Sequence, residues 1–66
     1  MSKSIGEKVK EAREARDISQ QQLAKLIQKS QALICRIEQG KRKPGLHTAI
    51  QLSNVLGIKL EDLIED

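Results

Sequence analysis

Two short helical segments follow each other so closely in this sequence that the link between them restricts the whole fold. The spacing of apolar residues predicts one helix over about 20–27 and the next over 31–39. Only residues 28–30 connect them, and so short a link cannot turn one helix back along the other. The two helices must therefore cross steeply. Their inner faces are defined by Leu23, Ala24, Ile27, Ile34 and Ile37.

The ends of these two helices carry residues that satisfy free backbone groups. Ser19 and Gln22 form a capping box at the start of the first helix, and Ser30 is the N-cap of the second. Gly40 is expected to end the second helix in the left-handed conformation.

Three further helices account for most of the remaining chain. They are predicted over about 4–16, which begins with a Ser4–Glu7 capping box, over about 46–56, and over about 60–65. In no segment do apolar and polar residues alternate as they do in a β-strand. The sequence therefore predicts an all-α fold, a compact domain of five helices. The helix over 46–56 is defined by Leu46, Ala49, Ile50 and Ser53, and Gly57 is expected to end it.

Length and composition exclude several classes of protein. The 66 residues are fewer than the ~100–150 of a typical domain, so we expect a single domain over 1–66, with residues 1–3 disordered. The absence of Phe, Tyr and Trp excludes the aromatic platforms on which single-strand binders stack bases. One cysteine, Cys35, and one histidine, His47, provide neither a disulfide nor a metal site.

Features typical of enzymes, of membrane proteins and of secreted proteins are missing from the sequence. There is no glycine-rich phosphate loop, no set of metal ligands and no nucleophile paired with a base, so we expect no catalytic site and no cofactor. No apolar stretch predicts a membrane span, and the N-terminal sequence lacks a secretory signal. The sequence therefore predicts a soluble, cytoplasmic protein.

Basic residues gather in the first two thirds of the chain and acidic residues near its end. Residues 1–30 carry seven Lys/Arg and four Asp/Glu, residues 31–45 carry four and one, and residues 46–66 carry one and four. This asymmetry would attract a polyanion to the basic part and keep the acidic end away from it. The alternative is a solvated surface whose charges have no partner.

The outer face of the helix over 31–39 suits the edges of bases in duplex DNA. Gln pairs well with adenine, Arg pairs well with guanine, and small residues fit beside the methyl group of thymine. In a steeply crossed pair of helices, the second presents its outer face to the major groove. The alternative is a set of ordinary exposed helix formers. The residues on this face are Gln31, Ala32, Cys35 and Arg36.

From Ile5 to Ile64 the chain resembles the Cro/C1-type helix-turn-helix family, which includes the lambdoid phage repressors. Each short motif is weak, but their order and spacing are specific. The motifs are Ile5-Gly6-Glu7, Ser19-Gln20-x-x-Leu23-Ala24, Ile34-x-x-Ile37-Glu38-x-Gly40-Lys41-x-x-Pro44 and Leu56-Gly57-Ile58-x-Leu60-x-x-Leu63.

The resemblance implies a DNA-binding domain in which the helix over 31–39 reads the major groove. It assigns base reading to Gln31, Ala32, Cys35 and Arg36, and contacts with the DNA backbone to Gln20, Ser30, Lys41, Arg42 and Lys43. Gln20 has a simpler alternative role as a polar residue of the helix start. The three basic residues of the loop have a simpler alternative role as a solubilising charge run.

Arg13 and Glu38 match two positions that can form a buried ion pair in the family, and we interpret them as structural. The sequence also departs from the family pattern. Gln28 and Lys29 replace a glycine and an apolar residue in the turn, so the resemblance implies a small left-handed strain at Gln28. Leu26 and Leu33 stand where polar residues are commoner, so they are either peripheral core or a small apolar patch for a partner.

The resemblance implies a transcriptional regulator that binds double-stranded DNA as a homodimer, because one domain reads too few base pairs for specificity. We expect repression from an inverted-repeat operator. The predicted dimer interface is Leu56, Leu60, Leu63 and Ile64, although Leu60 and Leu63 would alternatively hold the C-terminal helix on the core.

Two other functions fit the same features. The first is a protein-binding helix-turn-helix module, such as a bridging coactivator or an antitoxin. The second is a restriction–modification controller that acts as an activator and contacts RNA polymerase. A phosphate binder loses DNA affinity steeply with added salt, whereas a protein-only module does not.

Overall fold

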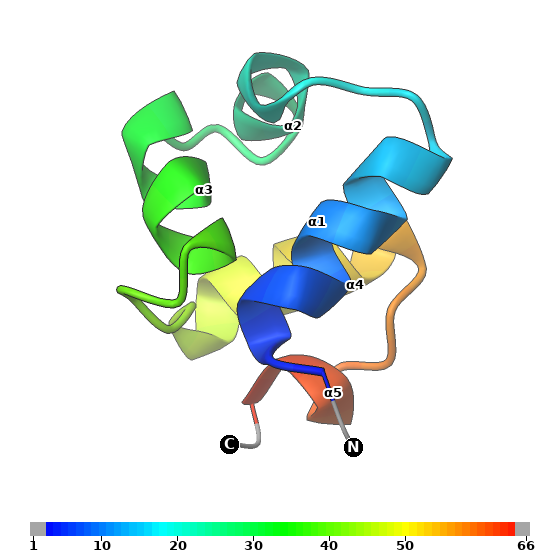
Figure 1. Ribbon diagram of the computed structural model, residues 1–66, viewed down its shortest axis with the longest axis vertical. Coiled ribbons are helices and arrows are strands. Elements are labelled where there is room, and N and C mark those ends of the chain that lie inside the picture. Colours follow the sequence, from blue (N-terminus) through cyan, green and yellow to red (C-terminus); the bar gives the residue numbers. More distant parts are fainter. Residues whose placement is uncertain (1–2, 65–66) are drawn as a thin grey trace.

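The structure, a computed structural model, describes residues 3–64, and over that range it consists of helices joined by turns and loops, without strands (Figure 1). The predicted all-α fold with five helices is confirmed. Residues 1 and 2 of the predicted disordered segment, and residue 65 of the predicted last helix, lie outside the described residues. The helices are α1 (Ile5–Ala15), α2 (Gln20–Leu26), α3 (Gln31–Glu38), α4 (Leu46–Leu56) and α5 (Glu61–Ile64).

The first three helices begin at serine N-caps. The hydroxyl of Ser4 accepts from the backbone N–H of Glu7 at 3.2 Å, while Oε1 of Glu7 accepts from the N–H of Ser4 at 2.9 Å. Ser19 and Gln22 make the same reciprocal pair at 3.0 and 2.8 Å. Oγ of Ser30 accepts from the N–H of Leu33 at 3.1 Å. These bonds fix where α1, α2 and α3 start.

The same three helices end in one motif, whose left-handed residue is Asp17, Gln28 or Gly40, with φ values of 58°, 58° and 78°. After α3, the N–H of Gly40 donates to the carbonyl of Ile37 and the N–H of Lys41 to that of Arg36. This is the Schellman arrangement, for which glycine is preferred. The left-handed conformation predicted for Gln28 is present, and that of Asp17 was not predicted.

The core lies between α1 and the other helices: α1 contacts α3, α4 and α5, while α2 packs on α3 and α5 packs on α4. In Figure 1, α1 crosses in front of α4, and α2 and α3 lie at the opposite end from α5. The fully buried side chains come from all five helices, so no helix is peripheral to the fold. They include Val9, Leu23, Ile27, Ile34, Ile37, Ala49, Leu52, Leu56 and Leu63.

The inner face of α4 differs from the one predicted. The buried residues of this helix are Thr48, Ala49, Leu52 and Leu56, whereas Leu46 is 62% and Ile50 is 40% exposed. Apolar residues occur on more than one side of this helix, so its sequence allows two different faces to be buried. The tertiary packing selects the one that continues to Leu56.

Helices α1 and α5 are also joined at the surface, where Nζ of Lys8 lies 3.7 Å from Oδ1 of Asp62. Within residues 3–64, no helix has the length and apolar character needed to cross a membrane.

Candidate nucleic-acid interface

Helix α3 exposes one polar face and buries the opposite one. Gln31, Ala32 and Arg36 are exposed, whereas Ile34 and Ile37 are buried. Cys35 is only partly exposed, so it lies at the edge of the outer face rather than at its centre. The structure therefore brings the four predicted base-reading residues to one side of the helix that follows the tight turn.

The basic loop continues this surface directly. Lys41, Arg42 and Lys43 are all exposed, and the chain is held at both ends of the loop. Before the loop, the backbone N–H of Lys41 donates a hydrogen bond to the carbonyl of Arg36 at 2.9 Å. After the loop, Pro44 is buried. Anchoring at both ends orders the loop close to the end of α3.

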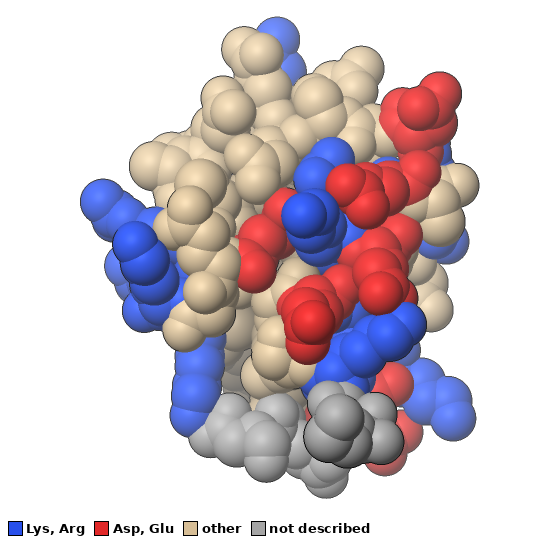
Figure 2. Space-filling view, viewed as in Figure 1, with Lys and Arg blue, Asp and Glu red and all other residues tan. Residues whose placement is uncertain are grey.

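Basic and acidic side chains are unevenly distributed over the surface. Figure 2 shows Lys and Arg side chains along the left edge, where Figure 1 places α3 and the loop after it, whereas over α1 acidic and basic side chains are mixed. Glu7, Glu11 and Glu14 are the exposed acidic residues of α1. A polyanion would thus be attracted to the side of α3 and its loop.

Two further predicted backbone-contact residues have structural partners of their own. Ser30 is exposed, and its hydroxyl caps α3. Gln20 is partly buried, and its Nε2 donates to Oε1 of Glu38 at 3.0 Å. Sequence reasoning missed this bond, because no spacing rule connects residues so far apart in the chain.

Arg13 and Glu38 form a two-pronged ion pair between α1 and α3. Nε of Arg13 lies 2.8 Å from Oε2 of Glu38, and its Nη2 donates to Oε1 at 3.3 Å. The two side chains are 11% and 4% exposed. Hydrogen bonding to Glu38 raises the pKa of Arg13, whose guanidinium is charged at physiological pH in any case.

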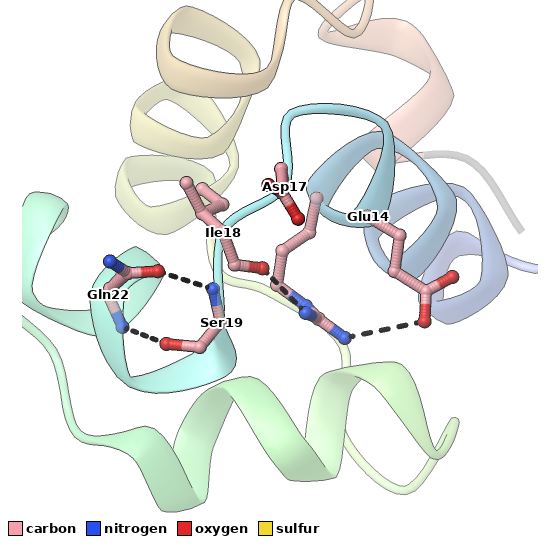
Figure 3. Close-up of a pocket in the computed structure, with 6 residues that line it drawn as sticks. Glu14, Asp17, Ile18, Ser19 and Gln22 are labelled. Carbon is pink, nitrogen blue, oxygen red and sulfur yellow. Dashed lines mark hydrogen bonds and ion pairs between the residues drawn. The ribbon is translucent and has the colours of Figure 1, made fainter.

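The Arg13 guanidinium makes two further contacts. Nη1 donates to the carbonyl of Ile18 at 2.8 Å, and Nη2 lies 4.0 Å from Oε2 of Glu14. These contacts line one wall of a surface hollow between α1 and α2, shown in Figure 3. Ser19 and Gln22 on the other wall are hydrogen-bonded to each other in the capping box. The polar side chains that line the hollow therefore belong to the helix cap and to the ion pair.

The described residues contain no group of three or more His, Cys, Asp or Glu side chains placed to hold a metal ion. His47 is exposed in the first turn of α4, and Cys35 is a free thiol. Neither residue lies in a cluster of metal-ligating side chains within residues 3–64.

The predicted dimer interface requires a correction. Leu56 is 2% exposed and Leu63 is fully buried, so both side chains belong to the core of the protomer and have no area left for a partner. Leu60 is partly buried, and only Ile64 is well exposed, at 52%. Exposed apolar side chains that the prediction missed are Leu46 and Ile50 on α4, which contacts α5.

The two leucines that depart from the family pattern have different environments. Leu33 is partly buried and packs against the core, whereas Leu26, on α2, is 59% exposed. Leu33 is therefore peripheral core, and Leu26 is an exposed apolar residue on the surface.

Comparison with known proteins supports the arrangement of these elements. Residues 9–63 match the family model described as helix-turn-helix. An uncharacterized HTH-type transcriptional regulator of Methanocaldococcus jannaschii is 36% identical over 56 residues, which cover 85% of each chain. The crystal structure of the restriction-modification controller protein C.AhdI from Aeromonas hydrophila superposes with a TM-score of 0.80 at 28% identity, covering 91% of each chain.

The matched region contains the steeply crossed pair α2 and α3, the exposed outer face of α3 and the basic loop. The family consists of DNA-binding regulators rather than enzymes, in agreement with the absence of catalytic motifs from the sequence. The chain therefore belongs to the Cro/C1-type helix-turn-helix family of transcriptional regulators.

Proposed function

We propose that this regulator binds an inverted-repeat operator as a homodimer, reads sequence with the outer face of α3 in the major groove, and represses transcription by occupying a promoter. The observation that carries the proposal is the continuous exposed surface from Gln31 and Arg36 to the loop residues 41–43, backed by the buried Ile34 and Ile37. This surface combines groups that read bases with groups that neutralise phosphates.

The roles within this surface follow from chemistry. Gln31 and Arg36 carry side chains that form two hydrogen bonds with adenine and with guanine, and Ala32 and Cys35 are small enough to lie against a thymine methyl group. Lys41, Arg42 and Lys43 contribute affinity that is independent of sequence and sensitive to salt.

The homodimer is supported by exposed apolar side chains on α4 and α5. Leu46, Ile50 and Ile64 are 62%, 40% and 52% exposed, although each is a large aliphatic residue. Burying them between two protomers related by a two-fold axis would remove that apolar area from water and would place two copies of α3 on one duplex. We propose this surface, with Leu60 at its edge, as the dimer interface.

The test is selection of bound sites from a random duplex library at two salt concentrations. We expect an enriched inverted repeat with half-site centres about 10 bp apart, and a steep loss of affinity with salt. Binding without sequence enrichment would contradict the proposed reading role of α3. Sedimentation of the wild type beside Ile64→Asp tests the interface, and an unchanged dimer in that variant would place the contact elsewhere.

A restriction–modification controller that activates transcription is the second candidate. It is favoured by the similarity to C.AhdI, whose structure covers 91% of the chain. A reporter gene placed downstream of the selected operator separates the two functions. Repression lowers its expression when the protein is supplied, whereas activation raises it.

A further inference from the structure

Lys29 stands immediately before the helix that carries the reading face. Ser30 is the N-cap of α3, and the backbone N–H of Lys29 donates to the carbonyl of Ala24 at 2.9 Å. Gln28, in the left-handed conformation, turns the chain between α2 and α3. The backbone of Lys29 is therefore held close to the first turn of α3, while the residue itself is exposed.

The positive charge of Lys29 has no acidic neighbour in the surrounding sequence. Residues 18–37 contain no Asp or Glu, and the next acid, Glu38, faces Arg13 in the buried ion pair. Within residues 3–64, no acidic side chain forms an ion pair with Lys29. Its charge is therefore not neutralised by the described part of the chain.

We propose that Lys29 contacts a DNA phosphate at the N-terminal end of α3, as a counterpart to the basic loop at the C-terminal end. The inference rests on the proposed function. It gives the reading helix a cationic group at each end, whereas the proposed function uses only the loop residues 41–43 to neutralise phosphates.

The dimensions of the groove supply the physical reason. Lys29 is two residues from Gln31, so their Cα atoms are at most about 7.6 Å apart. The major groove is only about 12 Å wide. A Gln31 side chain that reaches a base edge thus brings Lys29 close to the wall of the groove, where the phosphates lie. The flexible four-carbon stem of lysine allows its ammonium group to approach a phosphate without a fixed orientation.

The phosphate bound by Lys29 is distinct from those bound by the loop. Helix α3 has eight residues and is therefore about 12 Å long. Each DNA strand carries one phosphate charge per about 3.4 Å of the helix axis. Cationic groups at opposite ends of α3 therefore meet different phosphates, and their contributions to DNA affinity should add.

The test is titration of the duplex recovered by site selection at several salt concentrations between 50 and 200 mM. The proteins compared are the wild type, Lys29→Gln, Lys29→Arg and, as the matched control, Lys59→Gln. Lys59 is an exposed lysine in the link before α5, at the opposite end of the molecule from α2 and α3 (Figure 1). Arg42→Gln and its combination with Lys29→Gln complete the set. Circular dichroism establishes that each variant is folded.

We expect the affinity of the wild type to fall with salt more steeply than that of Lys29→Gln. The loss between 50 and 200 mM should be about 3.5-fold smaller in Lys29→Gln, because it releases the counterion of one phosphate fewer. Lys29→Arg keeps the charge and should keep the salt dependence of the wild type, as should Lys59→Gln. The double variant should show the reductions of Lys29→Gln and Arg42→Gln added together.

Three results would overturn the inference while leaving the proposed function intact. The first is an unchanged salt dependence in Lys29→Gln. The second is an equal reduction in Lys59→Gln, which would indicate an effect of net charge alone. The third is a double variant no different from Arg42→Gln, since the two cations would then share one phosphate. A wild type that shows no sequence-specific duplex binding would instead reject the proposed function, and the inference with it.

Discussion

Gly6 of α1 lies directly beneath the last turn of α3, where a β-carbon on Gly6 would come within 2.3 Å of the carbonyl oxygen of Ile37. The carbonyl oxygen of Glu38 would be 2.7 Å away. Both are backbone atoms, so they cannot rotate aside as a flexible side chain can. The absence of a side chain at Gly6 therefore permits the close approach of the two helices that the Arg13–Glu38 ion pair joins.

Replacing Gly6 with alanine should destabilise the protein, although alanine is the better helix former. The added carbon forces α1 and α3 apart, with an expected loss of about 1–3 kcal/mol in the free energy of unfolding. Urea unfolding followed by circular dichroism measures it. Gly45→Ala is the control, since a β-carbon there has no neighbour within 4 Å and the change should stay below about 1 kcal/mol. Equal losses in both variants would contradict the steric argument.

Removing one partner of the buried ion pair should be more damaging than removing both. Arg13→Met leaves the Glu38 carboxylate buried and without its cation, with an expected loss of about 3–5 kcal/mol. Adding Glu38→Leu to the same chain should restore part of that loss, because no isolated charge is then left in the interior. Urea unfolding of the two single variants and the double variant measures the coupling. Strictly additive losses would show that the two residues act independently.

Gln28→Gly should stabilise the protein by about 1 kcal/mol, because Gln28 has φ of 58° and only glycine adopts that conformation without steric cost. The matched control is Gln21→Gly, which lies within α2 and should destabilise by about 1 kcal/mol. Thermal unfolding distinguishes the two signs. A loss of stability in Gln28→Gly would show that its side chain contributes more than its backbone strain removes.

The capping box of α1 predicts a pH dependence. Hydrogen bonds from the backbone N–H and then from the hydroxyl of Ser4 lower the pKa of Glu7. A carboxyl group whose pKa is lower in the folded state stabilises the fold above its unfolded-state pKa, and this contribution disappears as the pH falls through the folded-state pKa. The difference in unfolding temperature between the wild type and Glu7→Gln should therefore be largest near neutral pH and vanish in acid. Parallel pH profiles for the two proteins would rule out this coupling.

Arg36→Ala and Arg42→Ala should weaken DNA binding in different ways. Loss of Arg36 should relax the preference at one base position by about 1–3 kcal/mol, whereas loss of Arg42 should weaken all sequences alike and reduce the salt slope by about one. Titrations of the selected operator and of a scrambled duplex at several salt concentrations separate the two effects. If Arg36→Ala weakens both duplexes equally, Arg36 does not read bases.

Much of the local structure could be predicted from neighbouring residues. Ser4 with Glu7, and Ser19 with Gln22, act within one helical turn, so their capping boxes are visible in the sequence. The left-handed conformation of Gln28 was expected from the glycine that the family pattern has at this position. The outer face of α3 was also predictable, because Ile34 and Ile37 leave only one side of that helix available to solvent.

The choice of buried faces depended on the tertiary structure. Leu46 and Ile50 have the same apolar character as Leu52 and Leu56, yet only the second pair is buried. The packing of α4 on α1 and α5 decides which apolar side is enclosed, and residues far away in the sequence determine that packing. The same limit explains why Leu56 and Leu63 were placed at a dimer interface.

The sequence by itself determined the helices, most of their ends, the steep crossing of α2 and α3 and the basic loop, because each depends on residues within a few positions of one another. Only the tertiary structure decided that Gly6 lies against Ile37, that Gln20 joins the Arg13–Glu38 pair and which side of α4 remains exposed. These features arise where distant segments meet. Contacts of that kind depend on how the helices pack in three dimensions, which no local spacing encodes.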